Sequence, residues 1–381
     1  MKIPTIKNIK NLKGKRIVLR LDFNVPISNG RIVETMRIDR ALPTIEYLIK
    51  KKARVVILSH IGKDASSSLA PVVKYLKKRM NVGLIPDFRT EAARKIIGNI
   101  PEGGVVVCEN LRLDDREAKN DPLFAKYLAS LGDIYVNDAF AVTHRAHASV
   151  TGITKYLPSY AGLLIEDELK HLSLALNPKH PFLFILGGAK FDTKLPLLKK
   201  FMKTADHIFV GGVLANDFLR DLGLGVGMSV VDTYDFKVTP LLRKGKIILP
   251  TDVVVTSAAY PRGVTKNITE VLPEESIVDA GMETVRDLVP ILKKAKLIIW
   301  NGPLGYYEGG FDKGTIALLK EITKTKATSV IGGGDTAAVV EKLGLDKKLS
   351  FVSTGGGAAL DYLADGKLPG IDAIIKNKKR K

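Results

Sequence analysis

The sequence predicts an α/β fold with parallel sheets, divided between two domains. The chain has 381 residues, which is more than a single core of ordinary size accommodates. Short apolar runs rich in β-branched residues alternate with amphipathic stretches of helical length, the pattern of α/β proteins. The short runs contain few polar residues, which is typical of parallel strands that are covered on both faces.

The strands are expected in two groups. Those of the first half cover 16–22, 54–59, 104–108 and 133–136. Those of the second half cover 182–186, 207–210, 297–300, 328–331 and 349–352. The residues that directly follow the strands differ in kind between the two groups, and this difference bears on function.

In the first half, the strands run into polar side chains such as Asp22, Asn24 and His60. In the second half, they run into glycine pairs and triples, as at 187–188 and 332–334. Ligands of open α/β sheets bind beyond the carboxyl ends of the strands. We therefore expect two half-sites for two different ligands, one with a charged rim and one where backbone approaches the ligand.

A helix is expected between the two halves, because Ile165, Leu169, Leu172 and Leu176 recur at helical spacing and Pro178 ends the run. The pattern fits a helix that connects two domains. It fits a peripheral helix of either domain equally well.

Composition narrows the class of protein. Hydrophobic residues make up 45% and the formal net charge is +19, of which the tail at 376–381 contributes five. Such an excess favours polyanionic partners: nucleic acid, acidic membranes or phosphorylated small molecules. The single cysteine, Cys108, excludes an internal disulfide and a multi-cysteine metal site. No apolar run reaches membrane-spanning length and no secretory signal is recognisable, so we expect a cytoplasmic protein.

Two glycine-rich loops, within 332–344 and 353–366, stand between a predicted strand and a predicted helix. Such loops expose backbone N–H groups at the positive end of a helix dipole, where phosphate binds, although ordinary turns also use glycine. Similar glycines follow the strands at 182–186 and 207–210, which favours phosphate binding. The sequence contains no GxxxxGK[ST] motif, and GLGVG at 223–227 lacks GxGxxG spacing, so neither a P-loop nor a dinucleotide fold is indicated.

Three side chains near these loops each have a structural and a functional interpretation. Lys190 and Lys194 flank an expected helix start that Asp192 or Thr193 could cap. Cations there oppose the helix dipole, which an anionic ligand would explain. The alternative is that both are solvated lysines of a lysine-rich chain. Asp335 fits a helix N-cap and a Mg²⁺ ligand equally well.

Three arginines of the first half, Arg37, Arg112 and Arg145, stand in loops or at element ends, as do three histidines. Guanidinium groups clamp phosphate and carboxylate bidentately, although a single arginine is more often part of a surface ion pair. Together these side chains outline a basic pocket. The histidines are His60, His144 and His147, and the last two lack the third ligand of a zinc site.

At these residues the sequence resembles the phosphoglycerate kinase family. The matching segments occur in the family's order and cover nearly the whole chain. They are RLDFNVP (20–26), MRIDRALPTI (36–45), SHIGK (59–63), ENLR (109–112), YVNDAF (135–140), HRAH (144–147), LGGAK (186–190), LP.D (249–252), WNGPLGYYE (300–308), GGGDTA (332–337) and STGGGAAL (353–360).

The resemblance implies two doubly wound, parallel-sheet, Rossmann-like lobes joined by a helix and a hinge. The expected divisions are 1–160 for the glycerate-binding lobe, 161–177 for the connecting helix and 178–364 for the nucleotide-binding lobe. The tail at 365–381 is expected to pack back on the first lobe.

The resemblance also implies a role for particular residues. The 3-phosphoglycerate ligands would be Asp22, Phe23, Asn24, Arg37, His60, Ile61, Gly62, Lys63, Arg112 and Arg145. The nucleotide ligands would be Gly188, Lys190, Lys194, Gly211, Gly212, Asn301, Pro303, Gly305, Glu308, Gly333, Gly334, Asp335 and Thr336, with Asp335 on Mg²⁺. The catalytic groups would be Arg37, Lys190, Gly355, Gly356 and Gly357.

One departure from the family pattern is the segment SHIGKD, where the family has SHxGRP. Lys63 keeps the charge of the arginine but loses its bidentate fork, and Asp64 replaces proline. The contact at position 63 is therefore the one that the resemblance supports least.

The implied reaction is 1,3-bisphosphoglycerate + ADP ⇌ 3-phosphoglycerate + ATP, with Mg²⁺ carried by the nucleotide. The attacking phosphate oxygen and the leaving carboxylate are both anionic at pH 7, so no general base is needed. A monomer with no nucleic-acid or membrane partner is expected. Two other classes stay open: a nucleic-acid-binding protein, which the charge would explain, and a non-catalytic nucleotide-binding module.

Overall fold

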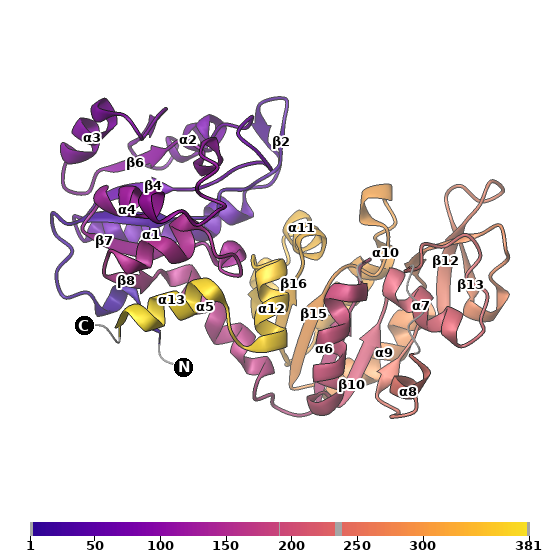
Figure 1. The fold of residues 1–381 in the computed structure, drawn as a ribbon. Coiled ribbons are helices and arrows are strands. Elements are labelled where there is room, and N and C mark those ends of the chain that lie inside the picture. The colour runs from indigo at the N-terminus through magenta and orange to yellow at the C-terminus, as the bar shows by residue number, and fades with distance from the viewer. Residues whose placement is uncertain (1–2, 190, 233–237, 379–381) are drawn as a thin grey trace. The chain divides into compact units, whose positions relative to one another are not determined.

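The structure is a computed structural model that describes residues 3–189, 191–232 and 238–378. The chain divides into two compact units (Figure 1). The first unit holds the residues up to Lys170 and the C-terminal segment that begins at Asp365, and the second holds His171–Ala364. The boundary between Lys170 and His171 falls within the helix expected between the two halves.

The first unit is built on a six-stranded parallel sheet in the order β5-β6-β4-β1-β7-β8. Its strands are β1 (Arg16–Arg20), β4 (Arg54–Leu58), β5 (Val82–Ile85), β6 (Val105–Cys108), β7 (Ile134–Asn137) and β8 (Ser159–Ala161). The four predicted strands are confirmed, and the edge strands β5 and β8 were not predicted. Both missed strands are short, and β5 contains Gly83, so neither forms an apolar run that stands out.

Successive residues of the central strand β1 enter opposite layers of the core. Ile17 and Leu19 belong to one buried cluster, and Val18 belongs to the other. This alternation shows that the sheet is covered on both faces, as the apolar strands predict. The covering helices of this unit are α1 (Met36–Lys50), α2 (Ala70–Leu76), α3 (Glu91–Gly98) and α4 (Pro122–Ser130).

The second unit has its own six-stranded parallel sheet, in the order β11-β10-β9-β15-β16-β17. Its strands are β9 (Phe182–Leu186), β10 (His207–Val210), β11 (Ile247–Ile248), β15 (Leu297–Asn301), β16 (Thr328–Gly332) and β17 (Phe351–Val352). All five predicted strands are confirmed, so the predicted fold class, with two parallel sheets, is correct. Its helices are α6 (Phe191–Thr204), α7 (Val213–Asp221), α8 (Thr239–Leu242), α9 (Met282–Lys294), α10 (Lys313–Thr323), α11 (Gly334–Lys342) and α12 (Gly357–Asp365).

A three-stranded antiparallel sheet in the second unit was not predicted. Its order is β13-β12-β14, with β12 (Asp252–Thr256) paired to both β13 (Val264–Asn267) and β14 (Ser276–Ala280). The outer strands are only partly buried along most of their length, so their sequences lack the apolar runs that marked the parallel strands.

The helix expected between the halves is α5 (Leu163–Leu172), and it is followed by a short 3₁₀ turn at Ser173–Ala175. Ile165 and Leu172 are buried, whereas Leu176 lies beyond the helix and is exposed. The helix is therefore shorter than the apolar pattern suggested. In the part of the chain that the structure describes, no helix is long and apolar enough to cross a membrane.

The last helix, α13 (Pro369–Lys378), packs on the first unit. The Gly370 N–H donates to the Thr143 carbonyl oxygen at 2.8 Å. The Asn377 side chain donates to the Thr154 carbonyl oxygen at 2.6 Å and accepts from the Ser159 N–H at 3.1 Å. Residues 379–381, the second half of the basic tail, lie outside the described residues.

A buried carboxyl at the end of β7 holds the start of α5. Asp138 is fully buried, and its Oδ1 accepts a hydrogen bond from the Ile165 N–H at 3.0 Å. Burial raises the pKa of Asp138 from 3.8 to about 7, although hydrogen bonds to the carboxylate oppose this. The folded state therefore keeps a proton that the unfolded chain releases between about pH 4 and pH 7.

This group should make the first unit less stable as the pH rises through that range, because the folded state binds more protons than the unfolded state. We expect Asp138→Asn to remove this part of the pH dependence. The measurement is hydrogen exchange of β1 and β7 peptides at pH 5 and pH 8, corrected for intrinsic rates. Glu102→Gln, at an exposed carboxyl of the same unit, should show the same change of stability between pH 5 and pH 8 as the parent protein. If Asp138→Asn also showed the change of stability seen in the parent protein, the assignment to Asp138 would be contradicted.

Candidate active site

A pocket of about 540 Å³, called the cationic pocket below for the arginines that meet in it, lies at the carboxyl ends of the strands of the first unit. Four carboxylates line it as well: Asp64, Asp114, Asp115 and Glu117. Four of the predicted substrate residues line it: His60, Lys63, Arg112 and Arg145. His60 follows β4, and Arg112 lies in the 3₁₀ turn that follows β6. Burial and the neighbouring charges of Arg145 and Arg20 lower the pKa of Arg112, which shows how closely the cations are gathered.

Asp22 and Arg37 form an ion pair at the end of β1. The Arg37 Nη1 donates to the Asp22 Oδ2 at 2.6 Å, and Arg37 is the second residue of α1. Burial is the largest influence and raises the pKa of Asp22, but the charge of Arg37 and the smaller effects of its other neighbours together hold that pKa below its ordinary value. Arg37 is half-buried, so its guanidinium is both anchored and reachable.

The loop after β4 is held by side-chain amides. The Asn24 Oδ1 accepts from the Gly62 N–H at 2.9 Å. Asn110, fully buried, donates to the carbonyl oxygens of Ile61 and Ser67 at 2.8 and 2.9 Å. The Arg112 Nη1 donates to the Lys63 carbonyl oxygen. Arg112 thus fixes the backbone of Lys63, although the Lys63 side chain departs from the family pattern.

Two predicted substrate residues offer no side chain to a ligand. Phe23 and Ile61 both belong to the buried core of the first unit. Any contact they make with a substrate has to come from their backbone groups. Gly62 has a φ of +72°, and a Cβ there would lie 2.4 Å from the Ser67 Oγ, so this position requires glycine.

The pocket also gathers residues that sequence reasoning missed. Arg20, Glu117 and His147 line it, and Arg20 is 1% exposed. The sequence feature that was missed is Arg20, which directly follows the apolar residues 17–19 of β1. A charge at such a position has to be paired within the fold, but the sequence does not name the partners.

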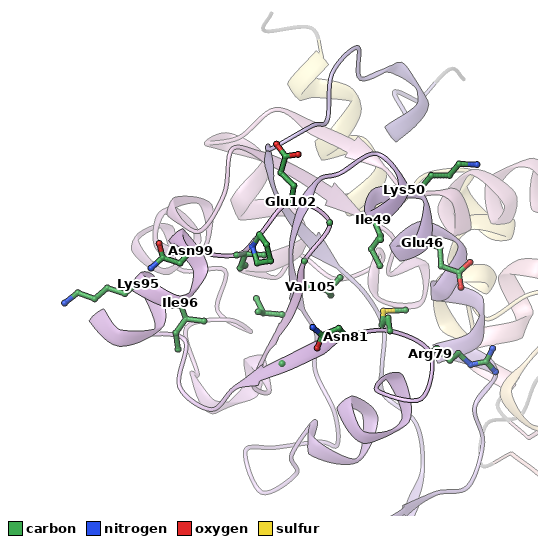
Figure 2. A pocket seen from close by; sticks show the side chains of 17 residues that line it. Glu46, Ile49, Lys50, Arg79, Asn81, Lys95, Ile96, Asn99, Glu102 and Val105 are labelled. Atoms are coloured by element: carbon green, nitrogen blue, oxygen red, sulfur yellow. The ribbon is translucent and has the colours of Figure 1, made fainter.

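A larger hollow of the first unit lies elsewhere (Figure 2). It has a volume of about 1060 Å³ and is lined by the residues just before β6, at the opposite edge of the sheet from the cationic pocket. Lys50, Arg79 and Lys95 line it together with Glu46 and Glu102. It contains none of the predicted site residues, so size alone does not identify the site.

The second unit has a mostly apolar cavity of about 400 Å³ at the carboxyl ends of its parallel strands. The predicted nucleotide residues that line it are Gly188, Gly212, Pro303, Gly305, Glu308 and Asp335. It also contains Asp279, which the sequence did not suggest. Burial raises the pKa of Asp279 to about 7, against hydrogen bonds that include one from the Gly314 N–H at the start of α10.

Glycine turns beside this cavity pack backbone against backbone. A Cβ at Gly212 would lie 2.6 Å from the Gly188 nitrogen, and one at Gly302 would lie 2.4 Å from the Gly187 oxygen. A Cβ at Gly333 would lie 3.0 Å from the Gly302 nitrogen. The turns after four different strands therefore meet where side chains do not fit. Backbone oxygens of the same turns accept from the Gly187 and Gly188 N–H groups at 2.9 and 2.8 Å, which ties the turns to one another.

Several other predicted residues stand at the same strand ends. Gly211 follows β10, and the buried Asn301 ends β15. Gly334 begins α11, and Thr336 is buried in its first turn with no partner for its hydroxyl among the described residues. Gly355, Gly356 and Gly357 lead into α12, which begins at Gly357.

Lys194 is the one predicted cation whose side chain the structure describes here, because Lys190 lies outside the described residues. It is 6% exposed, and its Nζ donates to the Gly187 carbonyl oxygen. Burial lowers the pKa of Lys194 to about 8, and Asp335 opposes this shift. The helix α6 begins at Phe191, so Asp192 and Thr193 lie within the helix and not before its first residue.

The capping interpretation of Asp335 is wrong. The N-cap of α11 is Gly333, no side chain caps the helix, and Asp335 is its second residue. Partial burial and the neighbouring Glu308 raise the pKa of Asp335, and Lys194 lowers it. Two carboxylates close enough to repel each other suit a cation between or beside them.

Among residues 3–189, 191–232 and 238–378, no group of three or more His, Cys, Asp or Glu is arranged to hold a metal ion. A resident metal cage is therefore absent from that part of the chain. Asp335 fits the other arrangement, in which Mg²⁺ takes one carboxylate and completes its shell with phosphate oxygens and water.

The close contacts of these glycines predict that one added methyl group destabilises the second unit. Gly212 has a φ of +62° and no room for a Cβ, so Gly212→Ala should lower the free energy of unfolding of the second unit by about 2 kcal/mol or more. Gly245→Ala is the control, because Gly245 has a φ of +67° but open space around it. The buried Trp300, the sole tryptophan, reports urea unfolding of this unit by fluorescence. Equal losses in both variants would contradict close packing.

Comparison with known proteins agrees with this geometry. The phosphoglycerate kinase family model matches residues 6–367. The phosphoglycerate kinase of Thermosipho africanus is 43% identical, with 98% of each chain covered, and that of Wolbachia from Drosophila simulans is 40% identical, with 99% covered. The solved phosphoglycerate kinase of Pyrococcus horikoshii matches all of both chains with a TM-score of 0.88 and 30% identity. That of Coxiella burnetii covers 98% of this chain and 99% of its own, with a TM-score of 0.84 and 37% identity. The chain belongs to the phosphoglycerate kinase family.

Proposed function

We propose that this chain catalyses the reversible reaction 1,3-bisphosphoglycerate + ADP ⇌ 3-phosphoglycerate + ATP. The observation that carries the proposal is the chemical contrast between its two pockets, in a chain of this family. One pocket gathers arginine, lysine and histidine, and the other is walled by glycine backbone with Lys194 and Asp335 beside it. The first suits a small, highly anionic acid, and the second suits a base and its phosphates.

In the first unit, we assign the acidic substrate to the cationic pocket. Arg112 and Arg145 would bind its anionic groups, and His60 would donate a hydrogen bond. Arg37 is the group assigned to the transferring phosphoryl. Its pairing with Asp22 supports this role, because the ion pair holds the guanidinium in place without a ligand and so lowers the cost of ordering it.

In the second unit, we assign the nucleotide to the apolar cavity. The start of α12 at Gly357 would supply N–H groups to its phosphates, together with the Lys194 ammonium, and the glycine turns would let the phosphates approach the backbone closely. Asp335 would hold Mg²⁺, which when bound neutralises charge on the nucleotide phosphates. Lys190 is kept as a proposed phosphate ligand from the family motif alone.

The proposed chemistry needs no general base, because the attacking phosphate oxygen and the leaving carboxylate are already ionised at pH 7. The work of the protein is to bind, to orient and to neutralise charge on the equatorial phosphoryl oxygens. The pockets suit that work. The titratable group in the cationic pocket best placed to act as a base, His60, has a pKa lowered to about 3 by burial and by Arg20.

We also propose that the protein acts in the cytoplasm as a monomer. A single buried cysteine supports the first statement, since disulfide bonding plays no part in this chain. Sedimentation would test the second. The enzymatic proposal itself is tested by a coupled assay of ATP consumption with 3-phosphoglycerate and Mg²⁺, and the absence of turnover by folded protein would refute it.

If Arg37 acts on the transferring phosphoryl group, Arg37→Ala should lower kcat about 100-fold or more, as expected for one preorganised charge donor. ADP affinity, measured by calorimetry without the second substrate, should hardly change. Arg79→Ala is the matched control, because Arg79 also faces an aspartate of the first unit but lies outside the cationic pocket. A kcat near that of the parent protein would refute the role.

If Asp335 holds Mg²⁺, Asp335→Asn should shift the Mg²⁺ activation curve to higher concentration. Its free energy of unfolding should change little, because Asp335 does not cap α11. Asp346→Asn, at an exposed carboxyl of the same unit, should leave both quantities as they are. An unchanged Mg²⁺ curve for Asp335→Asn would remove Asp335 from the metal site.

A further inference from the structure

The cationic pocket contains a buried arginine to which no role has been given above. Arg20 ends β1, and its side chain is 1% exposed. All three guanidinium nitrogens are engaged: Nε donates to the Ser149 Oγ at 2.9 Å, Nη1 donates to the Leu21 carbonyl oxygen, and Nη2 lies 3.2 Å from the His60 Nδ1. A buried guanidinium held at three points has little freedom to move.

The contact between Arg20 and His60 has a single chemical interpretation. A guanidinium only donates hydrogen bonds, so the His60 Nδ1 has to accept. A neutral imidazole that accepts at Nδ1 carries its proton on Nε2. The carboxylate of Asp22 does not reverse this, because its Oδ1 is 3.7 Å from the His60 Nδ1, beyond hydrogen-bonding distance.

A second buried group fixes Arg20 in turn. Glu117 is 3% exposed, and its carboxylate accepts from Ser149 twice: from the hydroxyl at 2.6 Å and from the N–H at 2.9 Å. Because the Ser149 hydroxyl proton points to Glu117, the lone pairs of its oxygen are left for the Arg20 Nε. Ser149 lies in a single π turn, Ala148–Gly152, a backbone feature that is frequent at functional sites.

We propose that the Glu117–Ser149 pair positions Arg20, and that Arg20 thereby fixes His60 as a neutral imidazole that offers its Nε2–H to the acidic substrate. Glu117 and Ser149 are then positioning residues, since they act through Arg20. The charged groups that face His60 are Arg20, Asp22, Arg112 and Arg145. Three of these four are cations, so a neutral donor adds a hydrogen bond to the site without adding repulsion.

The direction of the His60 pKa agrees with this arrangement. Burial lowers it first, Arg20 lowers it further, and Asp22 opposes them, which leaves a pKa of about 3. His60 should therefore stay neutral over the whole range in which the folded protein is studied. The statement about the substrate rests on the function proposed above, whereas the statement about the tautomer rests on the fold alone.

The test is a long-range ¹H–¹⁵N correlation spectrum of the full chain labelled at its six histidines, recorded without ligand between pH 5 and pH 8. The signal of His60 is assigned by its loss in His60→Gln. We expect one Nε2–H tautomer that does not titrate. A proton on Nδ1, an averaged tautomer or a titration near pH 6.5 in the parent protein would overturn the proposal without any variant.

Ser149→Ala then separates positioning from packing. Loss of the hydroxyl should give His60 an averaged tautomer signal and raise KM for 3-phosphoglycerate about tenfold, with KM for ATP unchanged. Glu117→Gln, which keeps the shape of the side chain, should give the same changes to a smaller extent. Ser329→Ala is the control. Ser329 is also a buried serine whose hydroxyl oxygen accepts a hydrogen bond, from the Ser350 N–H, but it lies in the second unit.

The outcomes are distinct. A parent-like His60 spectrum and KM in both variants would remove Glu117 and Ser149 from the site. A changed spectrum with no turnover even in the parent protein would leave the positioning intact and refute the proposed function instead.

Discussion

Burial of both faces of each parallel sheet is the constraint on which the rest of this structure depends. Along β1, Ile17, Val18 and Leu19 are all fully buried, on alternating sides. A strand of this kind has no position free for a polar side chain until it ends. Because parallel strands end at the same edge, Asp22, His60 and the turn that carries Arg112 are brought together although they are far apart in sequence.

The two units use the same edge in different ways. In the first, charged side chains fill it, and each buried charge has a partner: Arg37 for Asp22, and the Ser149–Glu117 pair for Arg20. In the second, glycine turns fill it so closely that no Cβ fits between Gly212 and Gly188. An unpaired charge is costly inside a protein, and so is an unpaired N–H group, and each edge leaves some of these groups to a ligand.

The sequence predicted what depends on strongly apolar runs and on family motifs. It predicted the strands β1, β4 and β9, and the family motifs supplied several residues of each pocket, but not Arg20, Glu117 or Asp279. It missed β5 and the antiparallel sheet around β12, because short or half-exposed strands lack a continuous apolar run. It left Asp335 between cap and metal ligand, a choice that depended on the helix beginning two residues earlier than a cap at Asp335 requires.

The connection between Arg20 and its partners could not have been predicted from sequence, and the reason is physical. Arg20 is 129 residues from Ser149, and Ser149 is 32 from Glu117, so no local pattern links them. They come into contact only in the folded first unit, where the end of β1 meets the π turn through the Arg20–Ser149 hydrogen bond.

The same problem, a charge held away from water, has opposite solutions in the two pockets. In the first unit, the arginines have fixed partners, and the two histidines near them, His60 and His147, have pKa values lowered to about 3 and about 4 by burial and by Arg20. In the second unit, the buried Lys194 has its pKa lowered to about 8, close to neutrality, and Asp335 has its pKa raised. Polyphosphate oxygens and a divalent cation would reverse both of these shifts, because each supplies the opposite charge that the buried group lacks. The first pocket is thus organised before its ligand arrives, whereas the second reaches its full charge only with the ligand in place.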